Sequence, residues 1–301
     1  MLRITKKQKE TYSASLIGMT RKRSQFGDML KRLLKNKLSV IGLVIVLVLV
    51  ILIVFAGIFT KYPYSEHDPT NRHSMPSAEH FFGTDNFGRD IWSRVLYGGR
   101  ISLLVAVVAV AISLSVGIIL GSTAGFFGGK VDTVISRVLD VVMAIPGLLL
   151  AIAISAALGP GPIKTAIAIS ISGMPSAARI VRSTVMSIKS NEFVEAARAT
   201  GSSSARTIVI HILPNILAPV IVDATLRMGG SILQISGLSF IGLGVQPPTP
   251  EWGSMLSESR EFIRTFWPMT VFPGVFIVLT MFGFNLFGDG LRDALDPKLK
   301  N

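Results

Sequence analysis

The chain contains no cysteine, only four histidines and few charged residues for its length. The absence of cysteine excludes disulfides, thiolate metal sites and a cysteine nucleophile, and four scattered histidines leave little for a histidine-rich metal site. Charged residues make up 16% of the 301 residues, whereas soluble chains carry about 25%. Because 50% of the residues are hydrophobic and the mean hydropathy is +0.56, the composition also excludes a disordered chain and an ordinary soluble domain.

Long runs without charge predict a membrane protein, because a helix needs about 20 apolar residues to cross the hydrocarbon core. The first run is uncharged for 23 residues and follows a basic tail, which is typical of a retained span and not of a signal peptide. Pro175 is expected to bend the fourth span. We predict six spans, within residues 38–60, 101–129, 141–163, 164–188, 215–236 and 265–288.

The formal net charge of +12 is concentrated in two stretches. Residues 1–37 hold eleven Lys and Arg against two acids, residues 179–206 hold five against two, and the rest of the chain is neutral. This placement follows the positive-inside rule and predicts that both termini are cytoplasmic. It also explains the charge without nucleic-acid binding, which we do not expect.

The predicted spans divide the chain into an anchor helix, an external segment and a five-helix core. The external segment is polar, with five acids, five bases and several turn residues. The expected boundaries are a basic N-tail at 1–37, the anchor at 38–60, the external segment at 61–100, the five-helix core at 101–290 with a cytoplasmic loop at 183–214, and a C-tail at 291–301.

Three glycines recur at four-residue spacing in the second predicted span: Gly117, Gly121 and Gly125. Small residues on one face of a helix let two backbones approach closely in lipid. The spacing is equally compatible with helix packing inside the chain and with packing at a subunit interface.

Residues 191–215 predict a short helix that lies across the membrane surface. Asn191 is placed to cap it, and Gly201 and the serines that follow are expected to end it. Its apolar face consists of small residues and one aromatic: Phe193, Ala196, Ala197 and Ala199. A helix resting on lipid would carry larger apolar residues, so this face favours docking into a groove of another protein.

A spaced motif in this stretch resembles the EAA loop of the permease subunits of bacterial ABC importers. In that family Glu-Ala-Ala is followed after three residues by Gly, and after nine more by Ile-x-Leu-Pro. The spacing here fits, with His211 at the Ile position as the one departure. The matching residues are Glu195, Ala196, Ala197, Gly201, Leu213 and Pro214.

Further stretches resemble the C-type permease of dipeptide and oligopeptide importers. They run from about residue 28 to the C-terminus, although nickel and glutathione permeases look similar, so the substrate stays open. The stretches are residues 80–103, 125–132, 145–153, 246–256 and 284–300.

The resemblance implies an all-α polytopic protein with the type I ABC importer transmembrane fold, in the bacterial inner membrane. It implies three kinds of protein partner besides the lipid bilayer: a homologous second permease, two cytoplasmic ATPases and an external solute-binding protein. ATP and Mg would be bound by the ATPases, with no cofactor in this chain. The EAA loop would couple this chain to an ATPase subunit. The alternative class, a self-sufficient secondary transporter, would favour an internal repeat, and none is visible.

No motif indicates that the chain itself is an enzyme. The nearest approach to a phosphate-binding loop, at residues 125–132, lacks the first glycine at the required spacing and a Ser or Thr after Lys130. Ser239 is not flanked by glycines as in a nucleophile elbow. We therefore expect a non-catalytic subunit of a complex that hydrolyses ATP elsewhere.

Three charges within or beside the predicted spans have two interpretations each. Asp223 and Arg227 are four residues apart, so they can pair on one helix face, either as a structural ion pair or as part of the path for a zwitterionic peptide. Asp140 is expected at the membrane interface near Arg137 in preference to a gate.

Overall fold

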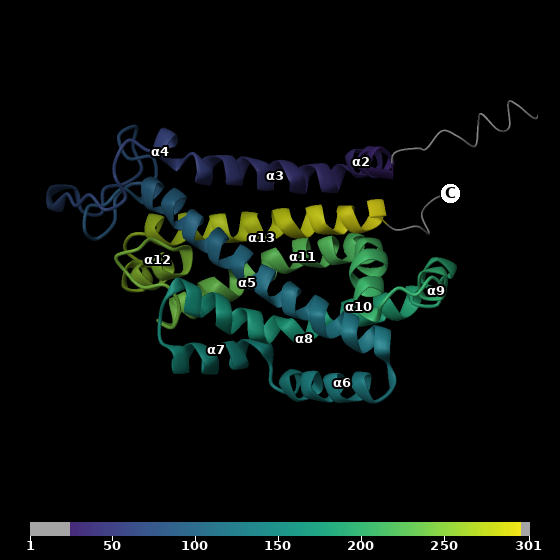
Figure 1. Cartoon of the computed structure of the whole chain (residues 1–301). Helices are drawn as coiled ribbons and strands as arrows, with labels where there is room; N and C mark the ends of the chain where they lie inside the picture. Colours follow the sequence, from purple (N-terminus) through teal and green to yellow (C-terminus); the bar gives the residue numbers. More distant parts are fainter. Residues whose placement is uncertain (1–24, 296–301) are drawn as a thin grey trace, which may run out of the picture.

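The computed structural model describes residues 25–295, and over that range the protein is helical with one isolated β-bridge between Thr84 and Asp90 (Figure 1). The predicted all-α fold is therefore confirmed. The helices are α2 Gln25–Lys35, α3 Lys37–Val54, α4 Ala56–Phe59, α5 Ile91–Phe127, α6 Gly129–Met143, α7 Gly147–Leu158, α8 Pro162–Ile188, α9 Glu192–Ala199, α10 Ser204–Arg206, α11 Leu213–Phe240, α12 Trp252–Glu258 and α13 Pro268–Leu295.

Four helical stretches in the described part of the chain are long and apolar enough to cross a membrane. They are α3, α5, α13 and the stretch Ser204–Phe240, which contains α10, a π-helical turn at Thr207–Ile212 and α11. The pair α6 and α7, bent by 83°, makes a fifth if it is one broken span. α8 has 27 residues but is more polar, so the predicted number of six spans is not confirmed.

The second spanning helix begins earlier than predicted, at Ile91 and not at residue 101. The cause is local, because the Asp90 carboxylate accepts a hydrogen bond of 2.8 Å from the Ser93 backbone N–H and caps the first turn. Residues 91–100, expected to belong to the external segment, thus form the first, polar part of α5. This helix ends at Gly128, whose φ of 66° lies in the left-handed region.

The third predicted span is not one helix. α6 ends at Met143 and α7 begins at Gly147, so the uncharged run at 141–163 crosses a sharp bend. Pro146 explains the break, because proline has no N–H to donate and disfavours helical geometry at the residue before it. In contrast, Pro175 lies inside α8 without ending it.

Two further predicted boundaries shift. α8 continues to Ile188, so the loop expected to begin at residue 183 begins after that helix. α13 continues to Leu295, so the predicted C-tail begins inside a helix. The N-tail, expected at 1–37, contains the amphipathic helix α2; Asn36 then caps α3 by accepting a hydrogen bond of 3.1 Å from the Leu38 N–H.

The glycines of α5 pack against α8 of the same chain, which decides between the two alternatives in favour of packing inside the subunit. A Cβ on Gly117 would lie 2.6 Å from Cβ of Ala177, and one on Gly125 would lie 2.8 Å from the carbonyl oxygen of Arg182. Gly121 faces the Ala178 carbonyl in the same way. Only glycine allows the two backbones to approach this closely.

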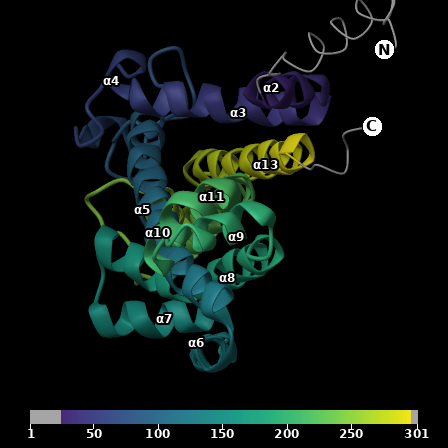
Figure 2. The ribbon, with the colours of Figure 1, turned by 45° about the vertical axis from the view of Figure 1, so that its right-hand side comes forward.

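The molecule has two distinct ends, at which different helices lie (Figures 1 and 2). α9 lies at one end together with α2 and the last turn of α13, so both ends of the described chain lie at the α9 end. α4 and α12 lie at the opposite end. The largest apolar cluster joins α3, α5, α11, α12 and α13, and a smaller one around Phe126 and Val194 lies at the α9 end.

Candidate functional site

The short helix α9 is fixed to the bundle by its inward face. Val194 is fully buried in the cluster that also contains Ile212 and Ile216, and Ala197 is buried beside it. The guanidinium of Arg198 lies over the ring of Phe126, 4.7 Å from the ring centroid. α9 is therefore held by contacts to the end of α5 and to the turn before α11.

The outward face of α9 carries Phe193, Glu195 and Ala196, which are all exposed. Ala197, which the sequence placed on the same docking face, is only 7% exposed and points inward. The exposed face of α9 is thus narrower than the docking face predicted from the sequence, because α9 uses part of its alanine-rich surface to pack on its own chain. Within residues 25–295 the Glu195 carboxylate has no ion-pair or hydrogen-bond partner.

Gly201 ends α9 through its backbone conformation. Its φ is +82°, and its N–H donates to the Arg198 carbonyl while the Ser202 N–H donates to the Ala197 carbonyl, both at 3.0 Å. This pair of bonds is a Schellman motif, which favours glycine at the left-handed position. A Cβ on Gly201 would meet no atom within 4 Å, so the constraint is backbone strain and not space.

The last two motif residues lie where the loop returns to the bundle. Pro214 lies in the first turn of α11, directly after the π-helical turn Thr207–Ile212. Leu213 is half-buried against the cluster that holds Val194. The six motif residues therefore divide into an exposed pair (Glu195, Ala196), a turn (Gly201), two residues packed on the bundle (Ala197, Leu213) and an exposed proline in the first turn of α11 (Pro214).

Asp223 and Arg227 form an ion pair on α11, with 2.5 Å between Arg227 Nε and Asp223 Oδ2. Arg227 Nη1 also donates to the Gly173 carbonyl of α8 at 3.2 Å. The pair lies between two cavities. Asp223 lines one of ≈ 590 Å³ between α8, α11 and α13, and Arg227 lines one of ≈ 160 Å³ between α5, α8 and α11.

Asp140 pairs with Arg179 of α8 at 2.9 Å, and not with Arg137 as the sequence suggested. Both side chains remain about half exposed, at 51% and 56%. A second ion pair joins the same two helices, with Arg182 Nε 2.5 Å from Asp132 Oδ1. The bent helix α6 is therefore attached to α8 by charge, which sequence spacing alone does not reveal.

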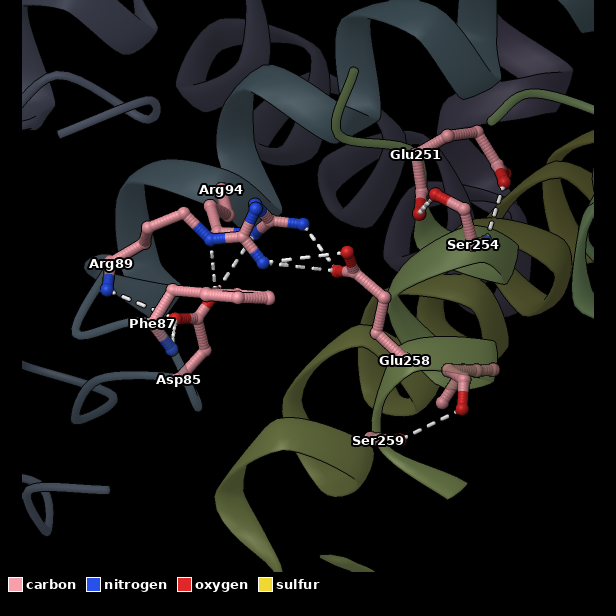
Figure 3. A network of polar contacts seen from close by, with 9 residues as sticks. Asp85, Phe87, Arg89, Arg94, Glu251, Ser254, Glu258 and Ser259 are labelled. Carbon is pink, nitrogen blue, oxygen red and sulfur yellow. Dashed lines mark hydrogen bonds and ion pairs between the residues drawn. The ribbon is translucent and has the colours of Figure 1, made fainter. Parts of the chain in front are cut away.

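A buried ionic cluster joins the segment before α5 to α12 at the other end of the molecule (Figure 3). Arg94 Nη2 lies 2.6 Å from Glu258 Oε2, and Arg89 Nε lies 2.6 Å from Asp85 Oδ2. Arg94 Nε is 3.5 Å from the same Asp85 oxygen, and Arg89 reaches Glu258 at 3.3 Å. Paired in this way, three buried charges and the partly buried Glu258 hold together segments that are far apart in the sequence.

Glu251 lies close to this cluster, outside the spanning helices, and is fully buried. It caps α12 by accepting from the Ser254 N–H at 2.9 Å, and it accepts from the Ser102 hydroxyl of α5 at 2.9 Å. Burial raises the pKa of its carboxyl above the ordinary value, although these hydrogen bonds oppose the shift.

Sequence reasoning missed these residues for identifiable reasons. The Asp85 to Arg89 spacing was a visible signal for an ion pair, but their partner Glu258 is remote in sequence. Polar residues inside apolar runs are also a signal, and Ser113 and Gln234, which line the smaller cavity, belong to this class. In the described part of the chain, no three His, Asp or Glu side chains gather closely enough to hold a metal ion.

Two family descriptions match the chain. Residues 117–301 match the binding-protein-dependent transport system inner membrane component family, and residues 24–76 match the N-terminal transmembrane domain of oligopeptide transport permease C. The fold is similar to a chain of the inward-facing MetNI methionine ABC transporter, with a TM-score of 0.55 and 16% identity, covering 68% of this chain and 98% of that one.

Several named relatives match over almost their full length. The dipeptide transport system permease protein DppC of Alkalihalophilus pseudofirmus is 50% identical, covering 92% of this chain and 91% of the relative. The oligopeptide permease OppC of Bacillus subtilis is 40% identical, covering 92% of this chain and 91% of the relative. The glutathione permease GsiD of Escherichia coli is 40% identical over 92% of each chain. The chain therefore belongs to the family of binding-protein-dependent transport system inner membrane components, the integral inner-membrane permeases of ABC importers.

Proposed function

We propose that this protein is the permease subunit of an ATP-driven importer for di- and oligopeptides, and that α9 is the element through which an ATPase moves it. The observation that carries the proposal is the two-sided character of α9. Val194 and Ala197 fix its inner face to the bundle, while Phe193, Glu195 and Ala196 stay exposed. Such a helix transmits force, because a partner that grips the outer face also moves the helices behind it.

The mechanism follows from this attachment. When two ATPases close on ATP, a docked α9 moves with one of them, and its contacts with α5 and α11 pass the motion to the bundle. The bundle then rocks between inward- and outward-facing states, provided that the docked complex has different contacts in each. ATP and Mg belong to the ATPases, and this chain supplies the path together with a homologous second permease.

The orientation proposed with this function places the α9 end in the cytoplasm. The basic stretches 1–37 and 179–206 favour that side. Both ends of the described chain lie at the α9 end, which supports cytoplasmic N- and C-termini. The external solute-binding protein would then dock at the α12 end.

Cross-linking tests the proposed role of α9, and the natural absence of cysteine makes single-cysteine variants free of background. In the intact complex, Ala196→Cys is expected to cross-link to an ATPase subunit. Met75→Cys, exposed at the α12 end, is the matched control and should reach the solute-binding protein instead. Cross-linking of Ala196→Cys to the binding protein would overturn both the docking site and the orientation.

The substrate is tested by uptake into proteoliposomes that contain the whole complex. Peptides are proposed because relatives named as dipeptide and di/tripeptide permeases match this chain at 50% and 44% identity, and an oligopeptide permease matches at 40%. Glutathione is the second candidate, because a glutathione permease matches at 40% identity. Labelled dipeptide, oligopeptide, glutathione and nickel are compared, and uptake of nickel or glutathione without peptide uptake would reject the peptide assignment.

A further inference from the structure

The cavity of ≈ 160 Å³ between α5, α8 and α11 has both apolar and polar lining residues. The apolar ones are Ala109, Val110 and Ile169. The polar ones are Ser113, Arg227, Ser231 and Gln234. Because about 10–15 Å³ suffices for one water molecule, this space admits several waters or a small polar group.

Two atoms lining this cavity are buried without a hydrogen-bond partner. They are the hydroxyl oxygen of Ser113 and the amide oxygen Oε1 of Gln234. Ser113 is only 4% exposed, so bulk water does not compensate it. Buried polar atoms in folded proteins are nearly always paired. Two residues that line the cavity therefore carry polar atoms whose hydrogen-bonding capacity is unused in the described structure.

Arg227 gives the cavity its charge. A guanidinium has five N–H donors, and in the described structure only two acceptors are used, Asp223 and the Gly173 carbonyl. Its counterion Asp223 lines the larger cavity instead. The charged group of the smaller cavity is therefore a cation with free donors, which suits an anion.

We propose that this cavity is a subsite for the C-terminal residue of a peptide during its passage through the permease. The carboxylate accepts hydrogen bonds from Arg227 and from the Ser113 hydroxyl, and the adjacent peptide N–H donates to Gln234 Oε1. A C-terminal residue carries both groups next to each other, as the cavity requires. The inference rests on the proposed peptide transport and adds a recognition site within this chain.

Two glycines of α11 allow a matched test by filling space. Gly230 lines the cavity, Gly237 does not, and a Cβ at either position would meet no atom within 4 Å. In the whole complex in nanodiscs, without binding protein, Gly230→Leu is expected to weaken binding of labelled dipeptide by about tenfold or more, the effect of losing a charge-assisted hydrogen bond. Gly237→Leu should bind as the wild type does.

Chemical specificity is tested with the same dipeptide carrying a C-terminal amide. The wild-type complex is expected to bind the free carboxylate about tenfold more tightly, and Ser113→Ala should narrow that difference without changing assembly of the complex. Equal binding of amide and carboxylate by the wild type, or equal effects of Gly230→Leu and Gly237→Leu, would show a cavity that holds only water. Absence of peptide uptake by the wild-type complex would instead reject the proposed function.

Discussion

The guanidinium carbon of Arg198 lies 4.7 Å from the centroid of the Phe126 ring, so α9 is connected directly to the last turn of α5. Phe126 is buried in the same cluster as Val194. α5 in turn is the helix that packs most tightly on α8 through its glycines. Side-chain contacts already in place therefore connect α9 to α5 and, through α5, to α8.

Replacing Arg198 by Gln is expected to weaken this connection. The lost cation–π contact contributes about 0.5–1 kcal/mol at an exposed site, so peptide uptake should fall a few-fold. ATP hydrolysis by the complex should persist, because the docking residues Glu195 and Ala196 are unchanged. Both rates are measured in proteoliposomes with saturating binding protein.

Arg206→Gln is the control for that variant. Arg206 has the same charge and lies in the same loop, but within the described residues its side chain contacts no ring or acid. Peptide uptake by the complex with Arg206→Gln should match that of the wild type. Equal losses in the two variants would show that the loop acts only through its net charge.

Gly201 should tolerate Asn better than Ala. The position requires φ of +82°, which costs an ordinary L-residue about 1–2 kcal/mol and Asn less. Because a Cβ there meets no neighbour, size has little effect on folding. We expect uptake in the order wild type, Gly201→Asn, Gly201→Ala, with the ATPase still copurifying. An unchanged uptake in Gly201→Ala would contradict the strained-turn interpretation.

Glu258 is expected to be critical for stability. Glu258→Gln removes the acid that pairs Arg94 and Arg89, and breaking one partner of a buried ionic group costs about 3–5 kcal/mol. Glu261→Gln, at an exposed position nearby, is the control and should be neutral within about 0.5 kcal/mol. Thermal unfolding in detergent compares the two, and similar melting temperatures would show that the cluster is not a stabilising feature.

The buried carboxyl of Glu251 predicts a pH dependence of stability. Its pKa is raised in the folded protein above the ordinary value of 4.5, so the folded state retains a proton that the unfolded chain has lost. The contribution of Glu251 is therefore most favourable below pH 4.5 and decreases as the pH rises through the folded pKa. Glu251→Gln cannot release the proton, so its melting temperature should fall less over this window. Parallel curves for variant and wild type would contradict the shift.

The membrane character and the presence of the short helix α9 could be predicted because they depend on local patterns. A run without charge at 38–60 is long enough to cross a bilayer in any context. α9 begins after Asn191, as predicted, although the Asn191 side chain makes no capping hydrogen bond. It ends at the turn of Gly201, so both ends depend on residues within one or two turns. Even the sharp bend after α6 had a local signal in Pro146, which the predicted third span overlooked.

What only the tertiary structure decided is which residues meet across helices. Arg94 and Glu258 are 164 residues apart, and Asp140 pairs with Arg179 of a different helix instead of its neighbour Arg137. The inward turn of Ala197 likewise depends on the apolar pocket beneath α9. Hydrophobic runs decide that helices form and insert, because each helix satisfies its own backbone hydrogen bonds. The rotation and contacts of each helix depend on packing against the others, which no single segment encodes.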